Sequence, residues 1–501
     1  MSRLQTDPRP VQLARLRSAR SWDVVVIGGG ATGLGCAVDA ASRGLSVLLL
    51  EAHDFAKGTS SRATKLIHGG VRYLAQGRVA LVREALRERS HLLANAPHLV
   101  WPQRFVVPVY GSVERLRYAA GLKLYDWLAG SHRAGRSECL DAAAMQDMFP
   151  ALKTRGLAGG VSYWDAQFDD AGLAIALMRT VQDLGGLALN YMPVEALLQR
   201  GGRVASVVAR DTETGERFTI DARTVINATG VWADRIRQLE APDTPPMLRP
   251  SQGVHVVLDA SFLRGRDALL IPRTPDGRVL FMVPWLGRVI VGTTDTPRND
   301  LPLEPTPLRG EVGLILDALT QYLKQPPSRA DFKGVFVGLR PLVAQSGRSG
   351  TAGLSREHVI QVSPGGMVTV TGGKWTTYRL MAEDAVDAAC ERGGLGSPVC
   401  MTSSLPLHGA DSGAVVPMSS GQLTEARIQE AVRCEAARTV EDVLSRRSRL
   451  LLLDAERAQA LAPWVARILA RELARDALWQ QSQVDAFDEL VSRSLAATEV
   501  D

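Results

Sequence analysis

Cysteine is scarce in this sequence, and the cysteines that it has are scattered. Five occur in 501 residues, and no two of them form a Cys-x-x-Cys pair. An odd number with such spacing indicates neither a disulfide framework nor a zinc or iron–sulfur site. We therefore expect a protein of a reducing compartment without a metal centre.

Long apolar runs and a strong excess of one charge are also absent. Runs such as 47–50 and 450–453 are far shorter than the roughly 18 residues of a membrane-spanning helix. The net charge of +5 is too mild over 501 residues to indicate a protein that binds nucleic acid. With 46% apolar and 22% charged residues, the chain has the composition of a folded globular protein.

The first 20 residues are rich in arginine but contain no apolar segment, which argues against a secretory signal. We expect residues 1–21 to form a basic, disordered lead-in. An organelle transit peptide is the alternative interpretation of the same residues.

Residues 23–51 have the pattern of the first unit of a nucleotide-binding sheet. A β-branched run, a glycine turn and a small-residue helix fill 23–43, and a second apolar run, 45–50, ends on Glu51. Glycines let the backbone approach a pyrophosphate, the helix N-terminus offers N–H groups to it, and Glu51 can accept a ribose hydroxyl. The pattern predicts a bound dinucleotide. The glycines of the turn are Gly28, Gly30 and Gly33.

Later segments predict that this nucleotide domain is discontinuous. Residues 151–370 consist mostly of short alternating segments with Gly and Pro between them, which is typical of an antiparallel sheet. Two segments, 224–230 and 367–373, repeat the pattern of a strand that ends at glycines. A helix beginning near Thr376 would aim its N-terminus back at those glycines. Such a long cradle favours FAD over NAD.

Residues 59–74, Thr-Ser-Ser-Arg-Ala-Thr-Lys-Leu-Ile-His-Gly-Gly-Val-Arg-Tyr-Leu, closely resemble a motif of the FAD-dependent, respiratory glycerol-3-phosphate dehydrogenases. The resemblance spans roughly 22–380, and 439–447 resemble the C-terminal helical cap of that family. It implies an α/β plus α+β fold: a glutathione-reductase-like FAD domain, an antiparallel substrate domain of the D-amino-acid-oxidase type, and the cap. Further motifs that match in order lie at 227–232, 292–295, 338–341, 355–356 and 372–379.

The expected domain boundaries follow from these motifs. The FAD domain would occupy about 22–110, 150–235 and 350–392, with a substrate domain inserted at about 236–349. A linker rich in Gly, Ser and Pro would cover 393–421, and a helical domain would fill 422–501.

The resemblance implies a reaction. The chain would oxidise sn-glycerol 3-phosphate to dihydroxyacetone phosphate by hydride transfer from C2 to non-covalent FAD, and would pass the electrons to a membrane quinone. A flavin oxidase of another hydroxy or amino substrate that uses oxygen is one alternative, and a non-catalytic flavin-stabilised scaffold is another. A homodimer is a possible assembly.

Two departures from the family pattern leave the substrate preference open. The family usually has Lys-Gly-Ser-His where this chain has Gln252-Gly253-Val254-His255, and many relatives have Arg where Gly172 stands.

The resemblance also assigns the pocket residues. Arginine forks match phosphate oxygens, so Arg72 and Arg356, with Tyr73, are expected to bind the substrate phosphate. Arg340 and Lys374 would stabilise the alkoxide and the reduced flavin. A histidine is neutral at working pH, so His255 is the candidate base, unless the nearby arginines lower the pKa of the hydroxyl without it.

The residues expected to hold FAD come from the same motifs. His68 is interpreted as a structural contact of the cofactor rather than as a base. The set is Gly28, Gly30, Gly33, Glu51, Thr59, Ser60, Ser61, Lys65, Leu66, His68, Val194, Ala228, Gly230, Gly373 and Thr376.

Residues 111–138 interleave apolar and aromatic residues with arginine and lysine. An interfacial helix presents this pattern to an anionic lipid surface, and the segment resembles the membrane-docking region of the family. A helix that covers the core and carries solvated arginines is the alternative. We expect a cytoplasmic protein associated peripherally with the inner face of the cell membrane.

Overall fold

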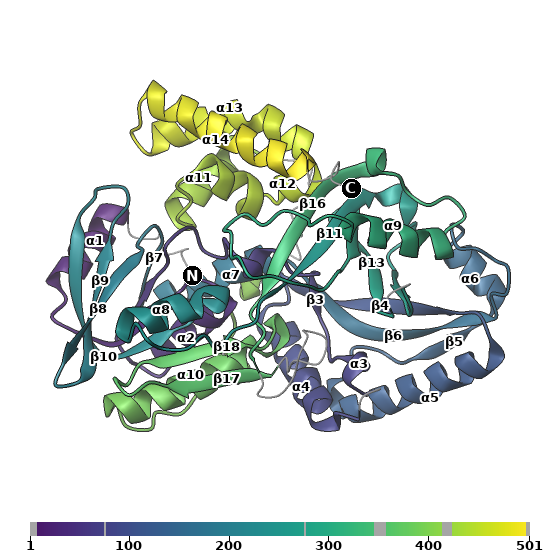
Figure 1. Cartoon of the computed structure of the whole chain (residues 1–501), viewed down its shortest axis with the longest axis horizontal. Helices are drawn as coiled ribbons and strands as arrows, with labels where there is room; N and C mark the ends of the chain where they lie inside the picture. The colour runs from purple at the N-terminus through teal and green to yellow at the C-terminus, as the bar shows by residue number, and fades with distance from the viewer. Residues whose placement is uncertain (1–7, 75–76, 275–276, 345–356, 413–422, 497–501) are drawn as a thin grey trace.

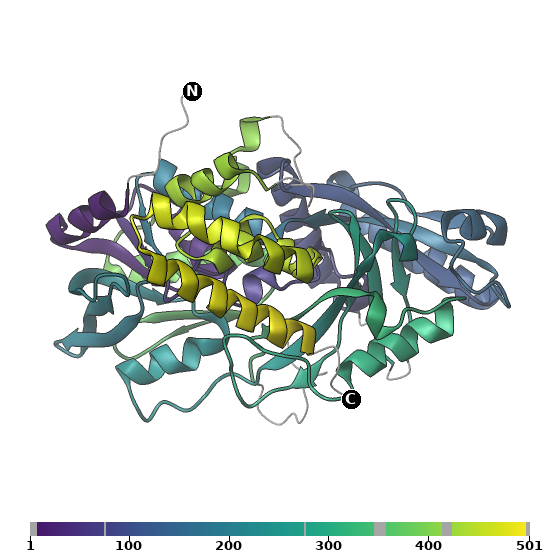
Figure 2. The same ribbon diagram turned by 90° about the horizontal axis from the view of Figure 1, so that it is seen from above.

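The computed structural model describes residues 8–74, 77–274, 277–344, 357–412 and 423–496. Two mixed sheets lie side by side along the long axis, and the C-terminal helices lie across the region between them (Figures 1 and 2). This arrangement confirms the predicted fold class.

The first sheet contains the predicted nucleotide-binding unit. Its central strands pair in parallel in the order β18-β10-β1-β2-β7, so that segments from distant parts of the chain form one sheet. Strands β1, β2 and β7 consist almost entirely of apolar residues, since both faces of the sheet are covered there. The strands are β1 (Trp22–Ile27), β2 (Val47–Leu50), β7 (Leu187–Leu189), β10 (Arg217–Asn227), β18 (Val368–Gly372) and the antiparallel edge strand β17 (His358–Val362).

Helices cover one face of this sheet and a β-ribbon covers the other. Small residues on α2 allow a close approach to α10: a Cβ on Gly35 would lie 2.8 Å from the ring of Tyr378. The ribbon extends antiparallel from β10. The helices are α2 (Ala31–Ser42), α7 (Asp170–Asp183) and α10 (Tyr378–Gly393), the ribbon strands are β8 (Val194–Arg200) and β9 (Arg203–Arg210), and α8 (Ala233–Glu240) lies beside them.

The second sheet is mostly antiparallel, as predicted. Its order is β15-β11-β14-β13-β12-β4-β6-β3, with β16 paired to β11 and β5 paired to β6. The strands are β3 (Leu66–Ile67), β4 (Val100–Val109), β5 (Glu138–Leu140), β6 (Gly159–Phe168), β11 (Ser251–Asp259), β12 (Ala268–Ile271), β13 (Leu280–Trp285), β14 (Arg288–Gly292), β15 (Thr296–Pro297) and β16 (Phe332–Arg340).

The second sheet is larger than the inserted segment that the sequence predicts. Strands β4 and β6, which the predicted boundaries assign to the FAD domain, pair with each other over ten residues and join β12. Their pairing is long-range, and local alternation cannot show which sheet a strand enters. Helices α6 (Ala142–Met148) and α9 (Glu311–Tyr322) cover one face, and α3 (Val71–Leu74), α4 (Val79–Asn95) and α5 (Ser112–Ala129) lie on the other.

Helix α5 covers the core with one face and exposes apolar residues on the other. Leu122 and Tyr125 are buried, whereas Leu116 and Trp127 are 73% and 68% exposed. The helix runs along the lower edge in Figure 1. Among the helices that the structure describes, none is both long and apolar enough to cross a membrane.

The expected disorder of the basic lead-in is wrong for residues 9–18, which form helix α1 (Arg9–Ser18). Leu13 and Leu16 are buried against the β-ribbon. Arg9 pairs with Asp211 at 2.9 Å and Arg17 pairs with Glu216, so the helix binds the ribbon through charges as well. Residues 1–7 lie outside the described part.

The predicted linker is in part packed structure. Leu407 is buried in the core of the first sheet, and the side-chain amide of Asn95 donates to the carbonyl of Thr402 at 3.0 Å. Residues 413–421 lie outside the described residues.

The C-terminal domain docks on the rest of the chain through buried charges. Asp54 accepts hydrogen bonds from Arg446 and Arg447, and Asp170 accepts one from Arg449 at 2.8 Å. All five of these side chains are almost fully buried. The domain has its own apolar core and comprises α11 (Glu425–Cys434), a π-helical turn (Asp442–Arg447), α12 (Leu450–Leu453), α13 (Ala455–Glu472) and α14 (Ala477–Ala496).

Replacing Asp54 by asparagine should strongly destabilise the protein. The pKa of Asp54 is lowered because the charges of Arg447 and Arg446 outweigh the opposing effect of burial. The carboxylate is therefore ionised at neutral pH. Its removal takes one buried counter-charge from both guanidinium groups: Arg446 keeps Glu441 and Asp442, and Arg447 keeps the more distant Glu435, at 3.8 Å. Removing one partner of buried ion pairs costs about 3–5 kcal/mol. Chemical unfolding of D54N measures this loss. In E195Q, which changes a surface carboxylate, the denaturant concentration at the unfolding midpoint should hardly change. Equal midpoints of D54N and E195Q would contradict the role of Asp54 in docking the C-terminal domain.

Candidate active site

A cavity of about 1620 Å³ lies between the two sheets. Ligand sites of small molecules usually occupy roughly 300–1,000 Å³, so this one has room for a dinucleotide and a further small molecule. The glycine turn and the ends of β10 and β18 line it from the first sheet. The 51–73 segment, which runs from the end of β2 to β3 of the second sheet and α3, also lines it. Strands β11, β13 and β16 line it from the second.

The glycine turn has the close backbone contacts that the sequence predicts. Gly28 has a φ of +109°, and a Cβ on Gly33 would lie 1.8 Å from the carbonyl oxygen of Gly28. Helix α2 begins at Ala31 without a side-chain cap from Gly30. The N–H of Ala31 donates to the hydroxyl of Ser60 at 2.9 Å, and the helix N-terminus adjoins the cavity at Thr32, which suits a pyrophosphate.

Glu51 lies at the end of β2 and lines the cavity. One carboxylate oxygen accepts the N–H of His53 at 2.8 Å and the other accepts the N–H of Gly29. Burial raises the pKa of Glu51, and these two N–H groups oppose the rise. The carboxyl group is thus oriented beside the glycine turn, where a ribose hydroxyl would bind.

His255 lies in the middle of β11, on the side of the cavity that the second sheet forms. Its ring stacks on Phe336 with centroids 4.6 Å apart, and Nε2 lies 2.9 Å from Oγ1 of Thr64. Its Nδ1 has no hydrogen-bond partner among the described residues. Burial, and then the charges of Lys65 and Arg340, hold the pKa of His255 well below its ordinary value. The imidazole is therefore neutral.

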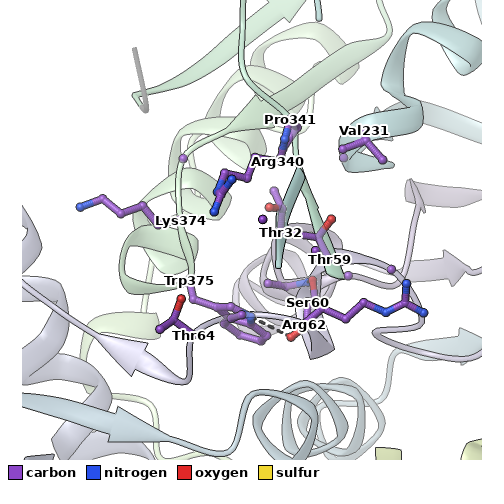
Figure 3. Close-up of a pocket in the computed structure, with 18 of the residues that line it drawn as sticks. Thr32, Thr59, Ser60, Arg62, Thr64, Val231, Arg340, Pro341, Lys374 and Trp375 are labelled. Atoms are coloured by element: carbon purple, nitrogen blue, oxygen red, sulfur yellow. Dashed lines mark hydrogen bonds between the residues drawn. The ribbon is translucent and has the colours of Figure 1, made fainter. Parts of the chain in front are cut away.

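Arg340 ends β16 and is held by main-chain carbonyls and by side chains, among them the hydroxyl of Thr293 at 3.1 Å. Its guanidinium donates to the carbonyls of Gln252 at 3.0 Å and Thr294 at 2.9 Å, and it lies 3.3 Å from a carboxylate oxygen of Asp295. A Cβ on Gly253 would lie 2.1 Å from the guanidinium, so only glycine leaves room for it. In Figure 3, Arg340 and Lys374 lie above the loop that carries Thr59 and Ser60.

The segment after β18 connects Lys374 to residues 55–70, which we call the cofactor loop. The ammonium of Lys374 lies 4.7 Å from the ring centre of Tyr73. Trp375 donates from its indole to the carbonyl of Ser60 at 2.9 Å, as the dashed line in Figure 3 shows. The hydroxyl of Thr376 accepts the N–H of His68 at 3.2 Å. A short 3₁₀ turn and then α10 begin here, close to the position predicted from the sequence.

The structure brings most of the predicted residues to one cavity. Lys65 is the main exception: its ammonium is buried outside the lining and bonds the carbonyl of Ser61 at 2.8 Å and Asp170 at 2.6 Å. The lining includes His255, Arg340, Lys374, Tyr73, Gly28, Gly30, Glu51, Thr59, Ser60, Leu66, His68, Val194, Ala228, Gly230, Gly373 and Thr376, but not Gly33, Ser61 or Lys65.

Two predicted phosphate ligands cannot be placed. Arg356 lies outside the described residues, and of Arg72 only the backbone, in α3, is described.

Two residues of the cavity are not among those predicted, although both lie inside the motifs 59–74 and 292–295. Thr64 is the hydrogen-bond partner of His255, and Asp295 is a partner of Arg340. Both are polar residues inside a motif, and this feature could have marked them as candidates. Their partners could not be identified, because each lies far away in the sequence.

Neither departure from the family pattern lines the cavity. The side chain of Gln252 is buried behind Arg340, and Gly172 lies in the first turn of α7. A Cβ on Gly172 would lie 2.6 Å from a carboxylate oxygen of Asp169, so a larger residue there would displace that side chain.

Comparison with known proteins decides the family. The profile of the FAD dependent oxidoreductase family matches residues 23–379. Mitochondrial glycerol-3-phosphate dehydrogenase of Saccharomyces cerevisiae is 40% identical over 80% of this chain and 68% of the relative. The rat enzyme is 35% identical over 95% of this chain and 74% of the relative. The chain belongs to the FAD-dependent glycerol-3-phosphate dehydrogenase family.

Two further similarities agree with this family. The C-terminal domain profile of alpha-glycerophosphate oxidase matches residues 417–481. The crystal structure of the glycerol-3-phosphate dehydrogenase from Bacillus halodurans, complexed with FAD, superposes with a TM-score of 0.80, at 27% identity and over 97% of both chains. The chain is thus an FAD-dependent oxidoreductase, and the glycine turn with Glu51 fits the dinucleotide part of FAD.

Replacing Gly30 by leucine should abolish the retention of FAD without unfolding the protein. The backbone of Gly30 is extended, and a Cβ there would touch only the hydroxyl of Ser60, at 3.0 Å, so the larger side chain would extend into the cavity. The flavin-to-protein absorbance ratio after gel filtration measures the loss. G121A, on a surface helix with open space around it, should keep its flavin; an unchanged ratio in G30L would contradict the assignment.

Proposed function

We propose that this chain oxidises sn-glycerol 3-phosphate to dihydroxyacetone phosphate, with non-covalent FAD as the hydride acceptor. The observation that carries the proposal is the arrangement of Arg340, Lys374 and neutral His255 around one cavity with the dinucleotide turn. The relatives named glycerol-3-phosphate dehydrogenase support the choice of substrate.

His255 and Arg340 have different parts in the proposed reaction: the first accepts a proton, and the second stabilises negative charge. Bound FAD supplies the acceptor for the hydride that leaves C2 of the substrate. The hydroxyl proton goes to Nε2 of His255, the ring nitrogen that bonds the cavity-lining Thr64. Arg340 lowers the pKa of the substrate hydroxyl by its positive charge, so the proton leaves more readily.

The phosphate of the substrate would bind at the Tyr73 end of the cavity. Tyr73 lines the cavity, and the ammonium of Lys374 lies over its ring, so that an aromatic ring and a cation stand together there. We assign Arg72 and Arg356 to this subsite because one guanidinium group can donate two parallel hydrogen bonds to phosphate oxygens. The helix α10 that follows Lys374 has its N-terminus at the cavity, which favours negative charge developing there.

The electrons would then pass to a quinone at a lipid surface. We define the docking face as the exposed apolar residues of α5, Val113, Leu116, Leu124 and Trp127. Arg117 and Lys123 are exposed on the same helix. A helix with apolar and basic residues together lies in the interface of an anionic membrane. We propose the cytoplasmic face of the cell membrane as this lipid surface.

Truncating the phosphate ligands should weaken substrate binding, whereas truncating the base should slow the chemistry. In R72A and R356A the half-saturation concentration for glycerol 3-phosphate should rise roughly tenfold or more, because each charge-assisted bond contributes on the order of 1.5–3 kcal/mol. In H255A the saturating rate of anaerobic flavin reduction should fall on the order of 10²–10⁴-fold. Stopped-flow absorbance separates the two quantities.

The surface arginine variant R200A is the matched control and should behave like the parent. Since the pKa of His255 is lowered well below 6.5, the reduction rate should show no protonation step of this histidine near that pH. If the half-saturation concentration of R72A and R356A for glycerol 3-phosphate equals that of the parent, the proposed substrate is wrong. If H255A reduces its flavin at the parental rate, the substrate assignment stands and the base is another residue.

Neutralising the basic residues of α5 should weaken membrane binding. The triple variant R115Q/R117Q/K123Q should lose about 1 kcal/mol per charge in binding to anionic vesicles. Co-sedimentation with vesicles of phosphatidylserine and phosphatidylcholine measures the loss. The control R200Q/R203Q/R217Q removes three surface charges elsewhere and should sediment like the parent. Equal sedimentation of all three proteins would assign α5 to solvent.

A further inference from the structure

A buried glutamate lies directly behind the arginine of the proposed site. Glu311 is the first residue of α9, is 3% exposed and does not line the cavity. Its two carboxylate oxygens accept four hydrogen bonds. Oε1 accepts from the hydroxyls of Thr294, at 2.9 Å, and Thr296, and Oε2 accepts from the N–H of Leu308, at 2.8 Å, and from the side-chain amide of Gln252.

Two of these four donors belong to the residues that hold Arg340. Gln252 and Thr294 each donate from the side chain to Glu311 and accept from Arg340 with the main-chain carbonyl. Each residue is therefore fixed on both sides. Arg298 donates to the side-chain oxygen of Gln252, so this amide is also held at both of its polar atoms.

The chemistry of the four donors explains why a carboxylate stands at this position. Only an ionised carboxyl group has two acceptor oxygens and no donor, whereas a glutamine would turn an NH₂ group toward one pair of donors. Gly253 follows Gln252 in β11, and because it has no side chain it leaves space for the guanidinium of Arg340. The carboxylate, the two carbonyls and this space together fix one orientation of Arg340.

We propose that Glu311 is a positioning residue that fixes Arg340 toward the reacting hydroxyl through Gln252 and Thr294. The proposal rests on the proposed function, in which Arg340 stabilises the developing alkoxide. A cation stabilises that charge best when it is already oriented, since a mobile side chain must reorganise during the reaction. Glu311 contributes this orientation without touching the substrate.

The test compares E311A and E311Q with the parent as FAD-loaded proteins. Anaerobic stopped-flow reduction by glycerol 3-phosphate gives the saturating rate and the half-saturation concentration. We expect the rate of E311A to fall about tenfold or more and that of E311Q to fall less, because the amide keeps one acceptor oxygen. The half-saturation concentration should change less than about threefold, since phosphate binding lies elsewhere.

A second background separates positioning from a general loss of structure. In R340A, adding E311A should slow the reaction no further, because the effect of Glu311 passes through Arg340. If E311A lowers the saturating reduction rate by the same factor in the parent and in R340A, the proposal is overturned. It is also overturned if E311A reduces its flavin at the parental rate. T296V is the matched control: it removes one donor to the same carboxylate but keeps the bonds from Gln252 and Thr294 to Glu311, so its rate should be unchanged.

A structural measurement decides the case independently of activity. The crystal structure of E311Q should show the guanidinium of Arg340 moved away from the carbonyl of Gln252 or of Thr294. An unmoved guanidinium would refute the positioning role, even if E311A does not fold. Failure of glycerol 3-phosphate to reduce the parent flavin would instead refute the proposed function, and the position of Arg340 in E311Q would still decide the role of Glu311.

Discussion

Two buried aspartates hold the cofactor loop between the first sheet and the C-terminal helices. Asp54 lies before the loop and binds Arg446 and Arg447, and Asp170 binds Lys65 within the loop and Arg449 from outside it. The loop between them supplies Thr59, Ser60, Thr64 and His68 to the cavity. Buried charges are tolerable only in such complete pairs, so the loop has little freedom while both aspartates remain paired.

The cavity needs both sheets because neither carries all of its chemistry. The first sheet contributes the glycine turn, Glu51 and the segment that ends at Lys374, which are groups that suit a dinucleotide. The second sheet contributes His255 and Arg340, which suit a hydroxyl that loses its proton. Two hydrogen bonds cross the junction, one between Thr64 and His255 and one from the hydroxyl of Thr59 to the carbonyl of Leu339, and they fix the two sets of residues relative to each other.

The sequence was sufficient for the parts of the site that lie in short motifs. That the glycine turn, Glu51, His255 and Arg340 line one cavity could be predicted, because each belongs to a local spacing pattern or to a motif. Their chemical roles stay predictions. The burial of Lys65 against Asp170 could not be predicted, since it depends on a residue more than a hundred positions away. The helix at residues 9–18 was mistaken for disorder because its arginines pair with Asp211 and Glu216, far along the chain. The same limit applies to β4 and β6, whose partners no local pattern identifies.

The bond from Arg449 to the carbonyl of Ser61, at 2.9 Å, has a thermodynamic consequence. No described residue of the C-terminal helices lines the cavity, yet this bond joins them to the loop that does. A cofactor that binds only the ordered loop must favour the docked helices, and by reciprocity the docked helices must tighten the cofactor by the same factor. Docking of the C-terminal domain and binding of flavin to this loop are therefore expected to stabilise each other.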